Sequence, residues 1–462
     1  MLFHSTRGKD RDKTFEQVLM QGLAKDGGLY MPNTWPQVDI DKLKNFDNFI
    51  DVAKEIVPLF TGSSFNKAEV ERLLDRTWHD FDKKDLINIY EINKSTSILE
   101  LFHGPTAAFK DFGLQLAAAF FNKTLQNQNK TALVFGATSG DTGSAAIDAC
   151  KEFSLIKSFI LIPEGSMSDI QRKQMTTVDK DNVFPILANG TFDDCQDIVK
   201  RGFNERNFLK SNQYLLAVNS INWVRIVGQI CYYFYASLKV NKLSESLNFS
   251  VPTGNFGNVF ACYAAFKMGM PLSKIVVAVN SNDILDRFFR NNDYSKSEVN
   301  ETISPSMDIS VASNFERLLY DFYLNRDSDL CSRLYSKFPD EGIQINEAIW
   351  DKSSDLFMSY SSDDISTSEC MQFYYKNFNY VMDPHTAVAA DAVKNLKNSL
   401  KGKTIILSTA HPAKFPLALK NAGLSINNIP NKLTEVLDKN EVAKKLNIKD
   451  NSIFRFIKEK NL

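Results

Sequence analysis

The segment HGPTAAFKDFG, residues 103–113, places Lys110 between two phenylalanines at the expected start of a helix. Lysine is almost never fully buried without a partner, because removing water from its ammonium group is costly. A lysine desolvated among apolar groups has a lowered pKa, and its neutral amine is then a nucleophile and a base. An arbitrary helix lysine more often extends its ammonium to water. Lys110 on its own therefore leaves both interpretations open.

A glycine-containing turn, TGNFGN at residues 253–258, follows an apolar run. Its backbone could approach a ligand closely at Gly254 and Gly257, and the N–H groups of the following helix would point back at the turn. Such an arrangement favours a phosphate dianion. The segment matches neither the dinucleotide pattern GxGxxG nor the P-loop pattern. An ordinary strand-to-helix turn is an equally good interpretation of this motif alone.

A second turn, TSGDTG at residues 138–143, adds the hydroxyls of Ser139 and Thr142. Hydroxyl and N–H groups at a helix start suit a carboxylate or a second phosphate. Asp141 would oppose an anion unless it turns away or meets a cationic group. A helix capped by Ser or Thr explains the pattern slightly better when it is taken alone.

A third loop, STAHPAKF at residues 408–415, places Ser408 and Thr409 where a strand is expected to end. A hydroxyl there is well placed to bond the ring nitrogen of a ligand. His411 and Lys414 could bind an anion, although surface positions are the slightly favoured interpretation for both.

Together these stretches meet the minimum requirement for pyridoxal phosphate, an aldehyde that carries a phosphate group. The aldehyde needs an amine, which Lys110 supplies. The phosphate needs an anion site, and the pyridine nitrogen needs a partner such as Thr409. This combination favours the reactive interpretation of Lys110.

The elements that position these loops follow one pattern of apolar strand, small-residue loop and helix. It occurs at residues 131–150, 249–270 and 404–423, and further buried strands are expected at 158–165, 183–190 and 274–280. Strands that alternate with helices predict a parallel α/β sheet. Ligands of such sheets bind at the carboxyl ends of the strands, where these loops would lie.

We expect three regions along the chain. Residues 1–95 form a mostly helical N-terminal region, residues 96–245 a first α/β part with the lysine and the SGDTG loop, and residues 246–462 a second α/β part with the glycine turn. The polar stretch near 283–380 predicts an insertion of helices rather than more sheet.

Composition narrows the class of protein. The 462 residues are 44% hydrophobic, enough for a large core, and 54 Lys and Arg nearly balance 55 Asp and Glu. This balance argues against nucleic acid and anionic membranes as partners. Six cysteines without a CxxC pair, and an N-terminus without an apolar signal core, predict a soluble cytoplasmic protein. Five histidines without a close pair make a metal site unexpected.

Six motifs in order resemble the threonine synthases of the longer type found in many bacteria and fungi. They are ELFHGPTAAFKDFG, ATSGDTGSAA, NSINWVRIVGQICYYFYA, VPTGNFGNVFA, SMDIS and TAHPAKF. The resemblance extends from FEQVLMQGLAKDGGLYMP to the last motif and so covers nearly the whole chain. It implies the tryptophan synthase β-like fold (fold type II), with pyridoxal phosphate in a cleft between two α/β domains. The implied activity is that of a carbon–oxygen lyase acting on phosphates, which forms L-threonine and phosphate from O-phospho-L-homoserine and water by β,γ-elimination and replacement.

The resemblance also implies roles for individual residues. Lys110 is similar to the Schiff-base lysine, and Thr409 to the residue that faces the pyridine nitrogen. Asp141 stands where relatives of this fold often have an Asn facing the ring hydroxyl, and longer threonine synthases also carry Asp there. The cradle for the cofactor phosphate corresponds to Gly254, Asn255, Phe256, Gly257 and Asn258. Whether Asp111 lies inside the site is left open.

The substrate brings a carboxylate and a phosphate, so two further anion sites are expected. The carboxylate is assigned to Ser139, Gly140, Thr142 and Gly143. The phosphate is assigned to Arg225 and Lys414, with Asn222 or Ser220.

Two alternatives to this function stay open. Another lyase of this fold, such as a serine or threonine dehydratase, would share the lysine and the glycine turn. A non-catalytic relative that binds a phosphorylated ligand is the other. The protein is expected to be a monomer or a homodimer.

Overall fold

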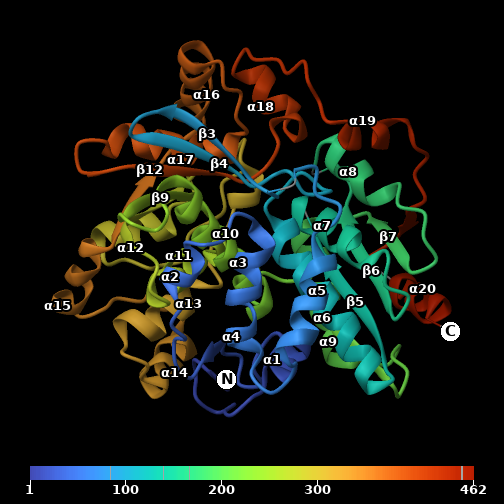
Figure 1. Cartoon of the computed structure of the whole chain (residues 1–462). Helices are drawn as coiled ribbons and strands as arrows, with labels where there is room; N and C mark the ends of the chain where they lie inside the picture. Colours follow the sequence, from blue (N-terminus) through green and yellow to red (C-terminus); the bar gives the residue numbers. More distant parts are fainter. Residues whose placement is uncertain (84, 139, 166, 449–450, 462) are drawn as a thin grey trace.

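Two α/β halves, each built on one mostly parallel sheet, make up most of the computed structural model (Figure 1). The structure describes residues 1–462 except 84, 139, 166, 449, 450 and 462. The fold class predicted from the sequence, two parallel-sheet α/β parts with a largely helical N-terminal region, is confirmed. Among the described helices, none has both the length and the hydropathy needed to cross a membrane.

The larger sheet has the strand order β11-β10-β9-β12-β4-β3, and only the edge pair β3–β4 is antiparallel. Every residue of β4, β9 and β12 is buried, as expected for central strands of a sheet covered on both faces. The strands span Asn88–Asn93 (β3), Thr96–Glu100 (β4), Leu247–Pro252 (β9), Leu272–Val279 (β10), Phe357–Ser361 (β11) and Thr404–Ser408 (β12).

The smaller sheet has the order β13-β7-β6-β5-β8, with every neighbouring pair parallel. Its strands span Thr131–Ala137 (β5), Ile156–Pro163 (β6), Val183–Ala188 (β7), Gln213–Leu216 (β8) and Lys444–Leu446 (β13). The helices of this half are Asp141–Cys150 (α7), Asp169–Thr176 (α8), Phe192–Glu205 (α9) and Ser452–Lys460 (α20).

The sheets do not follow the predicted division of the chain at residue 245. Strand β4, from the first predicted part, pairs with β12 in the larger sheet. Strand β13, near the end of the second predicted part, pairs with β7 in the smaller sheet. Short strands such as the lysine-rich β13 carry little local signal, because their pairing is decided by distant segments.

The expected insertion near 283–380 is mostly helical but also contains a strand. Strand β11 extends the larger sheet by pairing in parallel with β10, which corrects the expectation of helices alone. Its sequence, FMSYS, is half polar, as suits an edge strand, and this hid it from a search for apolar runs. The helices here are Ile284–Asn291 (α12), Phe315–Leu318 (α13), Ser328–Lys337 (α14), Glu347–Trp350 (α15) and Asp364–Phe378 (α16).

The helices of the N-terminal region pack against the two long helices that begin at residues 110 and 223. Figure 1 shows the N-terminal region in blue across the front of the molecule. Capping boxes at Thr14 and Asn66 start two of these helices. The elements are Phe3–Ser5 (β1), Tyr30–Pro32 (β2), Phe15–Gln21 (α1), Ile40–Leu43 (α2), Phe49–Ile56 (α3), Pro58–Thr61 (α4) and Lys67–Thr77 (α5).

Helices Lys110–Gln128 (α6) and Trp223–Asn241 (α10) cross closely in the centre of the molecule. The crossing needs glycine, because a Cβ on Gly228 would lie 2.9 Å from the carbonyl oxygen of Phe112. This contact brings the beginnings of α6 and α10 together. The remaining helices are Gly257–Lys267 (α11), Pro384–Leu396 (α17), Pro416–Asn421 (α18) and Asn431–Asp438 (α19).

Candidate active site

Four loops that follow parallel strands carry the residues predicted to react or to bind. Lys110 begins α6 after β4, Asp141 begins α7 after β5, the glycine turn lies between β9 and α11, and Thr409 follows β12. Main-chain hydrogen bonds join two of these loops directly: the Phe109 N–H donates to the Thr409 carbonyl at 2.9 Å. Asp141, which follows a strand of the smaller sheet, contacts Lys110 and Lys414 from loops of the larger sheet, so the carboxyl ends of both sheets face one site, as the strand pattern predicts.

Lys110 lies among charged groups but has little access to water. Its side chain is 12% exposed, and its Nζ lies 3.7 Å from Asp141 Oδ2 and 3.4 Å from Ser306 Oγ. Burial lowers the pKa of Lys110, and the charges of Lys414 and Arg225 lower it further, while Asp141 opposes them. The lysine is therefore prepared to lose its proton, as a nucleophile or base must.

Asp141 is the charge partner that these buried cations need. It is 4% exposed, its Oδ1 lies 2.7 Å from Lys414 Nζ, and it accepts a hydrogen bond from Gln171 Nε2 at 3.0 Å. Burial acts to raise the pKa of Asp141, but the charges of Lys414 and Lys110 outweigh burial and hold it well below its usual range. Asp141 thus stays ionised, and the positive charges of Lys414 and Lys110 offset its repulsion of an incoming anion.

Lys414 is wholly buried, in contrast to the surface position that its loop suggested. Besides Asp141, its ammonium donates to the Thr106 carbonyl at 2.8 Å. These two contacts occupy most of its capacity, so any phosphate that Lys414 binds must share it with Asp141.

The glycine turn presents free donors to its concave side. Phe256 adopts φ +63°, and its N–H donates to Thr253 Oγ1 at 3.1 Å. The N–H groups of Asn255, Gly257 and Asn258 have no acceptor among the described residues. Unsatisfied N–H groups at a helix start are the donors that bind phosphate.

Gly254 is needed where the turn meets the segment that carries SMDIS. A Cβ at this position would lie 2.8 Å from Ile309 Cγ1 and 3.1 Å from Met307 Cα. The side chain of Asn258 is already engaged, because its Nδ2 donates to the Pro252 carbonyl and its Oδ1 accepts from Thr253 Oγ1. Asn258 can therefore reach a phosphate through its backbone only.

Thr409 offers a free hydroxyl at the end of β12. The residue is 5% exposed, and its Oγ1 has no hydrogen-bond partner among the described residues. Its N–H donates to Thr386 Oγ1 at 3.3 Å, which holds the strand end in place.

The SGDTG loop retains fewer free donors than its sequence suggests. The N–H groups of Gly140 and Gly143 both donate to Thr138 Oγ1, at 3.1 and 2.9 Å. Among the described residues of this loop, Thr142 keeps a free N–H and hydroxyl for a ligand. Ser139 lies outside the described residues.

Arg225, on the first turn of α10, is a buried cation whose hydrogen-bonding capacity is largely unused. It is 4% exposed, its Nη1 donates to the Val218 carbonyl at 3.3 Å, and its Nε has no partner. No carboxylate of the described residues lies within 4 Å of it. Burial lowers the pKa of Arg225 to about 10, so it remains charged at neutral pH.

The two neighbours predicted to assist Arg225 are occupied differently. Asn222 caps α10 by accepting the Val224 N–H, and its Nδ2 donates to the Leu19 carbonyl at 2.8 Å. Ser220 lies beside Asn314, whose Nδ2 donates to its carbonyl at 3.3 Å. Asn222 is thus tied to the N-terminal region, whereas Ser220 lies near the glycine turn.

A hydrogen-bonded chain that the sequence does not reveal ends beside Lys110. Asp383 Oδ1 accepts from His385 Nδ1 at 2.9 Å, and His385 Nε2 accepts the Ser306 N–H at 3.1 Å. Since Nε2 accepts, the carboxylate holds the histidine as the Nδ1-protonated tautomer. The chain positions Ser306, whose hydroxyl contacts Lys110. The sequence signals available for this chain of residues were the segment Asp383-Pro384-His385 and the SMDIS motif. Neither segment shows which other loop its residues contact.

Asp111, next to the lysine, closes the loop that precedes α6. It is wholly buried and accepts the Thr106 N–H at 2.9 Å and the Thr106 hydroxyl at 2.6 Å. Burial, and then the charge of Asp148, raises the pKa of Asp111 to about 7. Asp111 therefore shapes the lysine loop and does not face the cofactor cradle.

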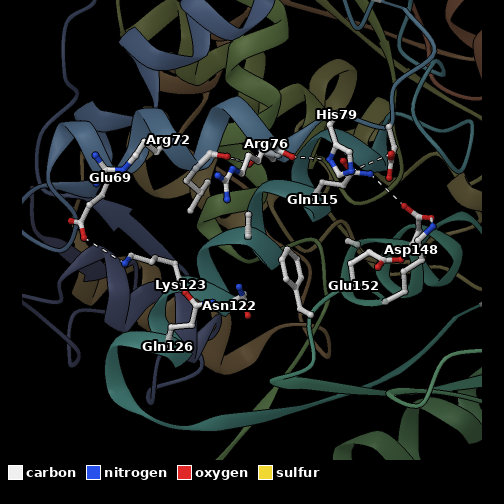
Figure 2. Close-up of a pocket in the computed structure, with 17 residues that line it drawn as sticks. Glu69, Arg72, Arg76, His79, Gln115, Asn122, Lys123, Gln126, Asp148 and Glu152 are labelled. Atoms are coloured by element: carbon white, nitrogen blue, oxygen red, sulfur yellow. Dashed lines mark hydrogen bonds and ion pairs between the residues drawn. The ribbon is translucent and has the colours of Figure 1, made fainter.

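A surface pocket of about 550 Å³ lies apart from these residues, between α5, α6 and the end of α7 (Figure 2). None of the predicted site residues that the structure describes lines it. Its charges largely neutralise one another: Glu69 pairs with Lys123 at 3.6 Å and Asp148 with Lys151 at 2.5 Å.

His411 predicts a measurable acid sensitivity. Burial, and then the charges of Lys432 and His103, lowers the pKa of His411 from 6.5 to about 4. The unfolded chain takes up a proton near pH 6.5 and the folded chain does not, so stability falls as the pH drops from 6.5 towards 4. Between pH 6.5 and pH 4, the free energy of unfolding of the His411→Asn variant should therefore fall by up to about 3 kcal/mol less than that of the wild type. Urea unfolding at these two pH values measures the difference.

The exposed His79 provides the control for this measurement. Its side chain is 66% exposed, so a His79→Asn variant makes the same substitution without removing a buried histidine. Equal pH dependence in the wild type and the His411→Asn variant would contradict the prediction.

Comparisons with known proteins agree along the whole chain. A family model described as pyridoxal-phosphate dependent enzyme matches residues 98–329. Models described as threonine synthase N terminus and threonine synthase, C-terminal, match residues 2–78 and 386–457.

Individual relatives show the same likeness. The threonine synthase of Pseudomonas aeruginosa is 40% identical over 445 residues, covering 96% of this chain and 94% of that protein. The threonine synthase of Saccharomyces cerevisiae is 40% identical over 463 residues, covering 92% and 90%. The crystal structure of PLP-bound threonine synthase from Brucella melitensis matches with a TM-score of 0.95 and 35% identity, covering 99% of both chains.

Proposed function

Because the chain belongs to the threonine synthase family, we propose that it converts O-phospho-L-homoserine and water to L-threonine and phosphate. It is a pyridoxal-phosphate-dependent carbon–oxygen lyase that acts on a phosphate ester, and its reaction is the last step of threonine synthesis. The alternatives, a dehydratase and a non-catalytic binding protein, are not favoured by the relatives.

The residues present fit pyridoxal phosphate. Lys110 would hold its aldehyde, the free N–H groups of Asn255, Gly257 and Asn258 would bind its phosphate, and the unpaired Thr409 hydroxyl would face its ring nitrogen. When bound, the cofactor supplies an electron sink for the negative charge that develops at the substrate α-carbon.

The protein's part in the chemistry is to move protons and to hold charge in place. The Lys110 amine would take the proton from the substrate α-carbon, because its lowered pKa favours the neutral form that a base needs. Ser306 and Asp141 keep this amine within the site. The Thr409 hydroxyl cannot hold a ring proton as a carboxylate would, which favours elimination at the β and γ carbons over transamination.

The second phosphate of the complex, on the substrate, is what separates this reaction from simple dehydration. The observation that carries the proposal is Arg225, a buried guanidinium near Lys110 whose Nε has no partner, and which has no carboxylate beside it, among the described residues. We assign the substrate phosphate to Arg225, supported by Lys414 and Ser220, and the substrate carboxylate to Thr142 at the start of α7. Asn222 would support this site from behind by capping α10.

Replacing Arg225 tests this assignment. We expect Arg225→Leu to lower kcat/KM for O-phospho-L-homoserine by about 30-fold, because a charge-assisted hydrogen bond to a phosphate contributes about 2 kcal/mol. Arg225→Lys, which keeps the charge, should lose less. Arg76→Leu, which removes an exposed arginine from the surface pocket, should leave phosphate release unchanged. Equal losses for Arg225→Leu and Arg76→Leu would contradict the assignment.

The choice of reaction is tested by supplying two substrates separately. Release of phosphate and formation of threonine from O-phospho-L-homoserine supports the proposal. Formation of ketobutyrate from threonine, without phosphate release from the first substrate, would show a dehydratase instead. We further propose that the enzyme acts in the cytoplasm as a monomer or a homodimer, without nucleic acid or membrane partners.

A further inference from the structure

Arg317, on the short helix α13, is a cation buried without a counter-charge. It is wholly buried, and its guanidinium donates to the Tyr30 carbonyl at 3.1 Å, to the Ile221 carbonyl at 2.6 Å and to Asn314 Oδ1. The ring of Trp223 lies 5.5 Å from its Cζ. All of these partners are neutral.

The acidic neighbour of Arg317 is used elsewhere. Glu316 points to the N-terminal region, where its carboxylate pairs with Arg7 at 2.9 Å and accepts from the Thr6 hydroxyl. Among the described residues, no carboxylate oxygen lies within 4 Å of the Arg317 guanidinium. Burial lowers the pKa of Arg317 to about 9 and Glu316 raises it only in part, so the group is still a cation at neutral pH.

A buried charge is costly unless an opposite charge compensates it. Neutral carbonyl groups satisfy the hydrogen bonds of a guanidinium but leave its net charge uncompensated. The folded chain therefore has an unbalanced positive charge near the centre of the molecule, and an anion that binds close by would be stabilised by it.

Asn314 connects this cation to the glycine turn. Its Oδ1 accepts from Arg317, and its Nδ2 donates to the Asn255 carbonyl at 3.0 Å. The backbone N–H of Asn314 also donates to the Asn255 carbonyl at 3.0 Å. A Cβ on Gly257 would lie 3.3 Å from Asn314 Nδ2, so this side chain packs against the turn itself. One side chain separates the cation from the free N–H groups of the cradle.

We propose that Arg317 is a positioning residue and the buried counter-charge for the cofactor's phosphate dianion, acting on the cradle through Asn314. The inference rests on the proposed function in that the glycine turn binds this phosphate. Neutral N–H donors alone give the phosphate hydrogen bonds, whereas Arg317 adds an unscreened opposite charge. It also orients Asn314, which fixes the Asn255 carbonyl and hence the direction of the following N–H groups.

The test compares ligands with and without the phosphate. Apo-protein is titrated with pyridoxal phosphate, with pyridoxal and with inorganic phosphate as a competitor, for the wild type, Arg317→Gln and Arg317→Lys. We expect Arg317→Gln to bind pyridoxal phosphate and inorganic phosphate about 10- to 100-fold more weakly, while its affinity for pyridoxal changes less than about 3-fold. Arg317→Lys, which keeps the charge, should retain most of the preference for the phosphorylated ligand.

A purely structural role predicts a different pattern. If Arg317 only joins α13 to the Tyr30 and Ile221 carbonyls, Arg317→Gln weakens both ligands equally, and this result overturns the inference. An unchanged preference for pyridoxal phosphate in Arg317→Gln also overturns it. A wild type that shows no preference for the phosphorylated ligand overturns the phosphate cradle as well as Arg317, so the two failures can be distinguished.

A second variant provides the test if Arg317→Gln does not fold. Asn314→Asp keeps the buried guanidinium and places a carboxylate beside it, which neutralises the internal charge; it also removes the Nδ2 donor to the Asn255 carbonyl. This variant should lose the preference for pyridoxal phosphate over pyridoxal by at least about 10-fold. Asn314→Asp with the wild-type preference overturns the inference.

Discussion

Replacing Lys110 with alanine is expected to lower the rate of threonine formation by at least about 10³-fold. In the proposed function, the amine that would hold the cofactor and the base that would take the α-proton are one group, so a single substitution removes both. Burial has already lowered the pKa of this lysine, and its amine donates to Ser306 Oγ at 3.4 Å. Phosphate release from O-phospho-L-homoserine measures the loss.

Two further observations show whether the lost activity reflects chemistry and not folding. Borohydride reduction followed by mass spectrometry should add the cofactor's mass to the peptide that contains Lys110 in the wild type and to no peptide in Lys110→Ala. Lys123→Ala, on the same helix, removes a lysine that pairs with Glu69 at 3.6 Å and should be fully active. A Lys110→Ala variant with more than about a tenth of the wild-type rate would contradict the assigned role.

The second large effect is expected on stability. Asp141→Asn should lower the free energy of unfolding of the apo-protein by about 3–5 kcal/mol, because it leaves Lys414 and Lys110 buried without their anion. The pKa of Asp141 is held well below its unfolded value of 3.8. Its contribution is therefore complete above that value and is lost only as the pH falls further. Urea unfolding at pH 7 and at pH 3 measures the difference.

Asp148 provides a matched control on the same helix. It also pairs with a lysine, Lys151, at 2.5 Å, but this pair lies nearer the surface, and burial raises the pKa of Asp148. Asp148→Asn should therefore cost less than about 1 kcal/mol. If the two variants lose equal stability, the buried pair at Asp141 does not have the importance assigned to it.

Much of the candidate site could be predicted because each part lies directly after a strand. The residue types of three short segments indicate their chemical roles: the segments that contain Lys110, the turn at 253–258 and Thr409. The parallel pattern then predicts that these segments meet at one edge. Local sequence is informative here because the chemistry and the turn geometry depend on the same few residues.

The partners of the predicted residues could not be found in this way. Lys414 was assigned to the substrate phosphate, but its ion pair with Asp141, which lies far earlier in the chain, had no signal in the sequence. Ser306 and His385 contribute through loops whose mutual position depends on the order of strands in the larger sheet. That order, and the transfer of β4 and β13 between the predicted parts, depends on long-range pairing that no local pattern records.

The strand order also decides when during synthesis the enzyme can form. Strand β12 lies between β9 and β4, so β4 lacks its parallel neighbour until residue 404 has been made. At about 5–20 residues per second, roughly 15–60 s pass between the synthesis of β4 and that of β12. The smaller sheet waits longer still, because β13 and α20, which complete it, follow β12 in the sequence. Lys110 and Thr409 therefore meet only after β12 has been synthesised, and until then one edge of β4 exposes backbone N–H and C=O groups that have no strand partner.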